Sequence, residues 1–168
     1  MTDVTDVTAL LSAVGPLQNR PQFERVLQLL DETERDPAAQ VVCGGSAAAR
    51  AWVGPGYFVP PTVVTGLDDT SALVTEEQFG PLLPVLRFED VDEVIDRANA
   101  GAFGLAGSVW TADVDVGSAL ARRLAVGTAW VNQHGRVDAR IPFPGVKESM
   151  VGVTCTHRRG RAIDPRIA

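Results

Sequence analysis

Among the residues of this chain that could act as nucleophiles or bases, we first consider the two cysteines and two histidines. A Cys43 thiolate next to two glycines could be activated by backbone amides, although free cysteine is most often a small buried side chain. Cys155 and His157 lie two positions apart, whereas the partners of a Cys–His dyad normally come from separate elements. His134 follows a predicted strand, where α/β proteins bind ligands, but an exposed loop histidine is the simpler interpretation. We therefore predict a catalytic role for none of the four.

The segment from Glu76 to Pro81, Glu-Glu-Gln-Phe-Gly-Pro, offers a different chemistry. Adjacent carboxylates cannot point the same way in a regular structure, so Glu76 and Glu77 are expected to have different roles. One of them could accept hydrogen bonds from a diol such as a ribose. Phe79 beside Gly-Pro would present a flat apolar face on a stiff turn. Taken alone, however, these residues favour a solvated acidic turn with one buried phenylalanine.

Motifs for phosphate or metal binding do not accompany these residues. The sequence contains no G-x-G-x-x-G after a strand, no G-x-x-x-x-G-K-[ST], no H-E-x-x-H and no C-x-x-C. We therefore predict no metal site and assign no phosphate-binding loop.

Periodic apolar residues predict the elements that position this chemistry in the first half of the chain. A stripe at i, i+3, i+4 and i+7 predicts a helix over Pro21–Arg35, with Asn19 as its cap. Gln40–Cys43 is predicted to be a strand and residues 46–56 a loop. The extended segments within 57–64 surround a Pro-Pro pair and suit a sheet edge or an irregular crossing.

The second half is more regular. Leu83–Phe88, Leu105–Trp110 and Thr128–Val131 are predicted strands, separated by helices that begin at Asp90 or Asp92 and at Asp113 or Asp115. Strands and helices that alternate with short links are typical of right-handed βαβ units. The sequence thus predicts an α/β fold with a parallel βαβαβ sheet.

Composition limits the class of protein. The 168 residues are 45% hydrophobic and 21% charged, which suits one globular domain. The formal charge of −6 argues against nucleic acid as the main partner. Residues 1–13 carry two aspartates and no Lys or Arg, unlike a signal peptide, and no apolar run approaches the ~20 residues of a membrane span. With two cysteines, the expected location is the cytoplasm, without a membrane partner.

A set of short motifs, in this order and with this spacing, resembles the aldehyde dehydrogenase superfamily. The motifs are Gly56-Tyr57-Phe58-Val59-Pro60-Pro61-Thr62-Val63, Glu76-Glu77-Gln78-Phe79-Gly80-Pro81, Ala98-Asn99, Phe103-Gly104-Leu105-Ala106, Gly127-Thr128-Ala129-Trp130-Val131-Asn132, Pro142-Phe143 and Gly145-Val146-Lys147-Glu148-Ser149. The resemblance runs from about Gly15 to Gly152. It covers only the C-terminal part of the family's catalytic domain, so it implies a partial catalytic domain within that α/β fold.

The resemblance also implies a function and two site residues. Family members attack an aldehyde with a cysteine thiolate, pass hydride to NAD or NADP, and release the acid with a glutamate-activated water. Glu77 matches the family's ribose-binding glutamate, and Phe79 matches the aromatic residue beside the nicotinamide. Asn132, Gln133 and His134 match, more loosely, the strand end and loop that approach the substrate tunnel.

In the family, the nucleophilic cysteine, the general-base glutamate, the oxyanion asparagine and the dinucleotide-binding domain all precede the segment matched here. We therefore expect a truncated family member that is inactive alone and does not bind NAD tightly. One alternative is one chain of a split enzyme, in which a separate chain supplies the nucleophile and the NAD domain; a homo-oligomer is the other partner that we consider. The other alternative is a non-enzymatic interaction module.

The chain departs from the family pattern near its end. Pro144 stands where glycine is usual, and Met150 follows Ser149 in place of glycine. Residues 1–135 carry 8 basic and 18 acidic residues (net −10), whereas residues 136–168 carry 7 and 3 (net +4). We therefore expect a weakly structured leader at 1–14, the partial catalytic domain at 15–152 and a divergent basic tail at 153–168. Our hypothesis for the tail is a frameshift near Gly152; absence of a family-like ending in the alternative reading frame would exclude it.

Overall fold

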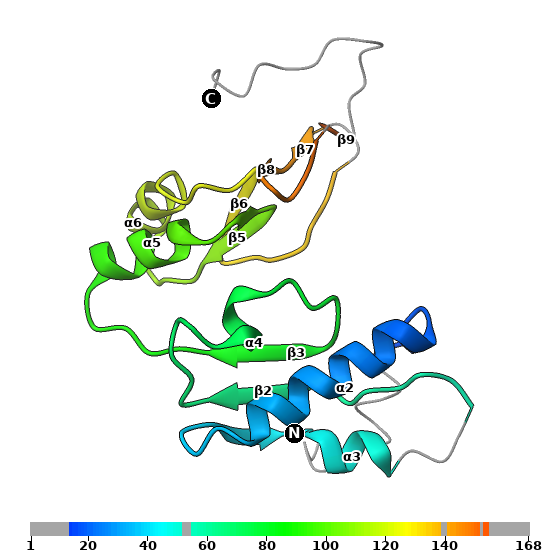
Figure 1. The fold of residues 1–168 in the computed structure, drawn as a ribbon. Coiled ribbons are helices and arrows are strands. Elements are labelled where there is room, and N and C mark those ends of the chain that lie inside the picture. Colours follow the sequence, from blue (N-terminus) through cyan, green and yellow to red (C-terminus); the bar gives the residue numbers. More distant parts are fainter. Residues whose placement is uncertain (1–13, 52–54, 139–140, 152, 155–168) are drawn as a thin grey trace. The chain divides into compact units, whose positions relative to one another are not determined.

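The computed structural model describes residues 14–51, 55–138 and 141–151, with the backbone of 153–154, and divides into two compact units (Figure 1). The first unit holds residues 1–87 and the second holds residues 88–168. Among the described residues, no helix is long and apolar enough to cross a membrane. The predicted leader and tail, 1–14 and 153–168, fall almost entirely outside the described residues.

The first unit is a three-stranded sheet with a long helix packed on it. Its elements are α2 (Arg20–Glu34), β1 (Gln40–Cys43), α3 (Ser46–Arg50), β2 (Thr62–Thr65), α4 (Ala72–Thr75) and β3 (Leu82–Val85). Strand β2 lies between the other two, antiparallel to β1 and parallel to β3, with Thr62 opposite Leu82. Figure 1 shows α2 running across this sheet.

Helix α2 forms because its N-terminus is capped and its apolar residues share one face. The Asn19 side chain accepts a hydrogen bond from the Gln22 amide at 2.9 Å, which confirms the predicted cap. Val26, Leu29 and Leu30 are at most 1% exposed. Their partners in the core include Val64, Leu73 and Leu82. Full burial of one such side chain stabilises by about 1.5–3 kcal/mol, so this cluster holds the helix on the sheet.

The prediction of a sheet edge within residues 57–64 is wrong. Thr62–Thr65 forms the central strand, and the Val64 side chain has no exposed area. The two prolines precede the strand, so they remove no hydrogen bond from its ladder. The first amide of the strand, Thr62 N, donates to Pro81 O at 2.8 Å.

Helix α3 replaces part of the loop that the sequence predicts over 46–56, and α2 holds it at both ends. Glu34 accepts hydrogen bonds from the Ser46 amide (2.7 Å) and hydroxyl (2.5 Å). At the other end, Arg50 forms a bidentate ion pair with Asp31, with N–O distances of 2.9 and 2.5 Å. Because these partners belong to another helix, the local sequence carried little signal for α3.

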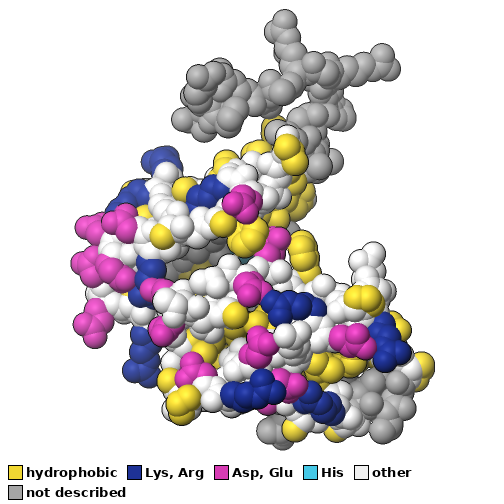
Figure 2. All heavy atoms as spheres, in the orientation of Figure 1, with side chains coloured by type: hydrophobic (Ala, Val, Ile, Leu, Met, Phe, Trp, Pro, Cys, Tyr) yellow, Lys and Arg dark blue, Asp and Glu magenta, His cyan; other side chains and the backbone are white. Residues whose placement is uncertain are grey.

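Side chains of both charge signs are interspersed on the face of the first unit that Figure 2 shows. Besides Arg50–Asp31, they include the ion pairs Arg20–Glu24 and Arg25–Glu76. Exposed pairs of this kind typically contribute about 0–1 kcal/mol, so the apolar cluster remains the main source of stability.

The second unit contains two helices and several short strands. Its elements are α5 (Val91–Ala100), β4 (Phe103–Gly104), β5 (Ala106–Val109), α6 (Val114–Ala121), β6 (Thr128–Val131), β7 (Phe143–Pro144), β8 (Val146–Lys147) and β9 (Val153–Thr154). Asp90 and Asp113 cap α5 and α6 through their carboxylates, which confirms the two predicted helices and selects the first aspartate of each candidate pair. Strands β5 and β6 are parallel and flank α6, as predicted for a βαβ unit.

The predicted α/β class with parallel strands is confirmed, but the strands are distributed between two sheets. Strand β3 pairs with β2 in the first unit, whereas β5 pairs with β6 in the second. The segment between β3 and β5 contains β4, which pairs antiparallel with β8. Within the described residues, the pattern is therefore two separate parallel pairs and not one continuous βαβαβ sheet.

Two polar side chains fasten the C-terminal end of α5. The Asn99 amide group accepts from Ala125 N at 2.6 Å and donates to Arg123 O at 2.8 Å. Lys147 Nζ donates to Asn99 O at 2.8 Å and to Gly101 O at 2.9 Å. A cation at this position also interacts favourably with the negative end of the helix dipole. Lys147, the single lysine of the chain, thus ties β8 to α5.

The Arg50–Asp31 pair predicts a pH dependence of stability. Hydrogen bonds from Arg50 hold the pKa of Asp31 below its ordinary value of 3.8. A carboxyl group whose pKa is lower in the folded state stabilises the protein at pH values above its unfolded-state pKa. This stabilisation is lost as the pH falls through the folded-state pKa. We expect Asp31→Asn to flatten the decline in unfolding free energy between about pH 4 and pH 2, measured by urea denaturation.

The control for this experiment is Glu77→Gln, which removes an exposed carboxylate from the same unit and should leave the decline unchanged. The decline should be reduced but not abolished, because hydrogen bonds from Thr70 also lower the pKa of Asp68. An unchanged slope in Asp31→Asn would contradict the assignment.

Candidate functional site

The loop from Glu76 to Pro81 connects α4 to β3, and α2 holds it from one side. The Arg25 guanidinium pairs with the Glu76 carboxylate. The Gln22 side-chain amide donates to Gln78 O at 2.5 Å and to Phe79 O at 3.3 Å. One turn of α2 therefore binds both the acidic start of the loop and two of its carbonyls.

The loop is also fixed from within by Gln78. Its side-chain amide donates to Leu82 O at 2.9 Å, and its side-chain oxygen accepts from Gly80 N at 2.7 Å. Gly80 lies so close to α2 that a Cβ there would come within 2.7 Å of the Val26 side chain. The close approach requires glycine at this position, and it presses the turn against the buried core.

These anchors leave two side chains of the loop directed to solvent, Glu77 and Phe79. The Phe79 side chain is 76% exposed, so the interpretation as a solvated turn with a buried phenylalanine is wrong. The Glu77 carboxylate forms no hydrogen bond or ion pair with another described residue, whereas Glu76 is paired. The expectation that the two adjacent carboxylates differ in role is confirmed in this respect.

The backbone of Phe79 is strained. Its φ is +41°, in the left-handed region that favours glycine. A bulky residue there costs about 1–2 kcal/mol, and with most of its ring exposed Phe79 recovers little of this by packing. The surrounding hydrogen bonds hold the exposed ring in place in spite of this cost.

The chemistry of this pair suits one end of a dinucleotide. A carboxylate with unused acceptor positions can bind both hydroxyls of a ribose, and an exposed aromatic ring can pack against a planar heterocycle. The residues present therefore fit the ribose and the nicotinamide of NAD or NADP. Among the described residues, we identify no site for the pyrophosphate.

In the second unit, the strand end after β6 carries the other predicted residues. The Asn132 side chain accepts from Thr111 N and donates to Thr111 O, both at 2.8 Å, and its φ is +53°. His134 Nδ1 lies 3.2 Å from Ser108 Oγ, and its ring packs edge-on to Trp130 at 5.3 Å between centroids. Asn132 therefore links two strand ends, and His134 is an exposed loop residue held by its neighbours.

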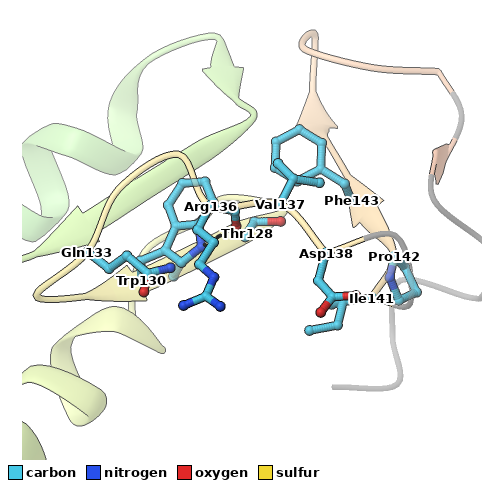
Figure 3. Close-up of a pocket in the computed structure, with 10 residues that line it drawn as sticks. Thr128, Trp130, Gln133, Arg136, Val137, Asp138, Ile141, Pro142 and Phe143 are labelled. Atoms are coloured by element: carbon cyan, nitrogen blue, oxygen red, sulfur yellow. Dashed lines mark hydrogen bonds between the residues drawn. The ribbon is translucent and has the colours of Figure 1, made fainter.

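A pocket of about 400 Å³ lies beside this loop (Figure 3). Trp130 and Phe143 form an aromatic wall, with ring centroids 6.4 Å apart and planes tilted by 30°. The Trp130 indole N–H donates to Arg136 O at 3.1 Å, which fixes the loop to the strand. The full lining is Thr128, Ala129, Trp130, Gln133, Arg136, Val137, Asp138, Ile141, Pro142 and Phe143.

The resemblance placed Gln133 near the substrate tunnel, but sequence reasoning did not single out Arg136, Val137 and Ile141. The chain between 133 and 142 has no periodic pattern, and only its place after a predicted strand suggested a ligand-binding loop. Side chains from an irregular loop become neighbours only through the turn that the loop makes.

Within the first unit, Cys43 does not belong to the 76–81 loop. Cys43 is half-buried in β1, with its sulfur 3.8 Å from Pro61 O, which agrees with the interpretation as a small packing residue. Cys155 and His157 lie outside the described residues. In the part of the chain that the structure describes, no group of three or more His, Cys, Asp or Glu side chains could hold a metal ion.

Known proteins match nearly the whole chain. The model of the aldehyde dehydrogenase family matches residues 4–162. A betaine aldehyde dehydrogenase of Brucella anthropi is 39% identical over 139 residues, which cover 83% of this chain and 28% of that protein. An aldehyde dehydrogenase of a Fusarium species is 39% identical over 140 residues, covering 83% of this chain and 30% of that protein.

Solved structures of aldehyde dehydrogenases are also similar to this chain. The NAD⁺ complex of an aldehyde dehydrogenase from Bacillus cereus has a TM-score of 0.76 and 41% identity, covering 83% of this chain and 28% of that one. An aldehyde dehydrogenase from Mycobacterium tuberculosis complexed with NAD⁺ has a TM-score of 0.75 and 33% identity, with the same coverage. The chain thus spans less than a third of the length of these relatives.

The geometry of the 76–81 loop predicts that two neighbouring substitutions differ in their effect on the free energy of unfolding. Gln78→Ala removes two hydrogen bonds and should lower the free energy of unfolding by about 1–2 kcal/mol. Phe79→Gly relieves the positive φ and removes an exposed ring, so it should not lower stability although glycine is more flexible when unfolded. Urea denaturation of both variants and the wild type measures the difference, and a Phe79→Gly variant less stable than the wild type would contradict the strain assigned to Phe79.

Proposed function

The chain belongs to the aldehyde dehydrogenase family, and from this premise we propose that it takes part in the NAD(P)-linked oxidation of aldehydes to carboxylic acids. The observation that carries the proposal is the fixed 76–81 loop, which presents an unpaired carboxylate and a strained, exposed aromatic ring. A purely structural turn would not need either feature. A site that receives a ribose and a flat heterocycle would need both.

In this proposal, Glu77 accepts hydrogen bonds from the ribose diol, and Phe79 packs beside the nicotinamide. When bound, NAD or NADP supplies the hydride acceptor. The contribution of the chain is positional: Gln22, Arg25 and Gln78 hold the loop so that the two exposed side chains keep one geometry. Such a loop can raise the reaction rate by holding the nicotinamide ring, which accepts the hydride, in a fixed position.

The aldehyde is proposed to occupy the pocket beside Trp130 in the second unit. Its aromatic wall suits an organic chain, and its volume of about 400 Å³ is within the range of small-molecule sites. The loop from Asn132 to His134, which resembles the segment near the family's substrate tunnel, adjoins it.

We further propose that these 168 residues do not complete the reaction alone. Neither cysteine matches the family's nucleophile, and Cys43 contacts only a carbonyl oxygen through its sulfur. A segment equivalent to the family's upstream domain would complete the enzyme, because a second copy of these residues adds no nucleophile. Apolar side chains at β1 and β3 are exposed, such as Val42 (65% exposed) and Leu83 (58% exposed), which supports a protein partner. A non-enzymatic interaction module is therefore the second candidate function.

The purified chain should therefore show no turnover. We expect no NAD or NADP reduction with a panel of aldehydes, and no tight NAD binding by calorimetry, because Glu77 and Phe79 reach only one end of the cofactor. Turnover that survives both Cys43→Ala and Cys155→Ala would contradict this account. Turnover that one of these substitutions abolishes would show that the nucleophile is that cysteine.

A chimera tests the proposed activity directly. Residues 15–152 should replace the matching segment of the Bacillus cereus enzyme and give an active aldehyde dehydrogenase. In that chimera, Glu77→Gln should raise KM for NAD about tenfold, since a hydrogen bond to a charged group is worth about 1.5–3 kcal/mol. The exposed carboxylate of Glu89 provides the control, and Glu89→Gln should leave KM unchanged. A folded but inactive chimera, or equal KM values in the two variants, would reject the proposal.

A further inference from the structure

The pocket of the second unit combines apolar walls with one cation. Val137 is 51% exposed and Ile141 is 62% exposed, so both present open apolar surface next to the Trp130 and Phe143 rings. Figure 3 shows these side chains around the pocket together with Arg136 and Asp138. A ligand with a hydrocarbon portion would cover the apolar surface and bring its remaining group near the charges.

No ion pair within the described residues compensates the charge of Arg136. Its guanidinium forms no ion pair with any residue that the structure describes, and its side chain is exposed at the pocket. Two other arginines of the unit are paired, Arg97 with Glu93 and Arg123 with Asp92. Asp138, the acidic residue of the lining, is half-buried and has an interaction of its own. The lining therefore holds the half-buried Asp138 and one exposed guanidinium, that of Arg136, which has no ion pair within the described residues.

Arg136 is held in position at its backbone. Its carbonyl accepts the Trp130 indole N–H at 3.1 Å, and the start of the loop is tied to Thr111 through Asn132. The guanidinium thus extends from a fixed point on the pocket wall and not from a free loop tip.

A guanidinium with free donors binds a carboxylate through two parallel hydrogen bonds, whereas it repels a cation. The aromatic wall alone could also attract a cationic ligand, but the charge of Arg136 opposes it. The combination of apolar walls and one unpaired guanidinium favours a short aliphatic ligand that ends in a carboxylate.

We propose that the substrates are aldehydes that carry a carboxylate, the semialdehydes of dicarboxylic acids, and that Arg136 determines this specificity. The inference rests on the proposed function, because it takes the pocket to be the aldehyde site. Arg136 would bind the carboxylate and leave the aldehyde end of the molecule free for the reaction.

The test is a titration of the full 168-residue chain, followed by the NMR signal of the Trp130 indole N–H, which Trp130→Phe assigns. The probes are 4-oxobutanoate, its neutral counterpart butanal and the cationic trimethylammonio-acetaldehyde, at constant ionic strength. We expect 4-oxobutanoate to bind about tenfold or more tightly than the other two, as a charge-assisted hydrogen-bonded pair allows. Arg136→Gln should remove this preference and leave the affinity for butanal unchanged.

Arg122→Gln is the matched control, because Arg122 is an exposed arginine of the same unit outside the pocket, and it should keep the preference. Equal affinities of the wild type for 4-oxobutanoate and butanal would overturn the assignment of Arg136, and so would a preference for 4-oxobutanoate that survives Arg136→Gln. In either case, binding of butanal would still support an aldehyde pocket. Inorganic phosphate binding as tightly as 4-oxobutanoate would overturn it in favour of a simple anion site. A Trp130 signal that no aldehyde moves would overturn both the inference and the proposed aldehyde pocket.

Discussion

Burial of one face of α2 against the sheet is the interaction on which the first unit and its candidate site both depend. Val26 lies in the core and also sets how closely Gly80 can approach. On the same helix, Gln22 and Arg25 bind the 76–81 loop through its carbonyls and Glu76. A change that moved α2 would therefore disturb the packing of the unit and the geometry of the loop together.

The 76–81 loop shows how local strain and exposure can be maintained. Phe79 has a backbone conformation that disfavours its side chain, and its ring gains little from packing. Neither feature stabilises the protein, so the hydrogen bonds of Gln78 and the contacts from α2 must offset them. Positions of this kind are typical of sites that are organised before a ligand binds.

In the second unit, several residues of the family-like motifs bond to the chain itself. Lys147 binds carbonyls at the end of α5, Asn99 binds the backbone of Arg123 and Ala125 after α6, and Asn132 pairs with the backbone of Thr111. Their role in the described structure is to fix strand ends and helix ends. The irregular loop between these fixed points then builds the pocket.

The sequence by itself determined the features that depend on neighbours along the chain. The cap and apolar stripe of α2, the aspartates that start α5 and α6, and the β5–α6–β6 unit all follow from local periodicity and hydrogen bonding. The ordered motifs also identified the family and singled out Glu77 and Phe79. The tertiary structure alone decided that Thr62–Thr65 is a central strand, that α3 forms, that Phe79 is exposed and that Arg136 borders a pocket. Each of these depends on contacts between residues distant in sequence, such as Glu34 with Ser46 or Gln22 with Phe79, and local patterns do not encode such contacts.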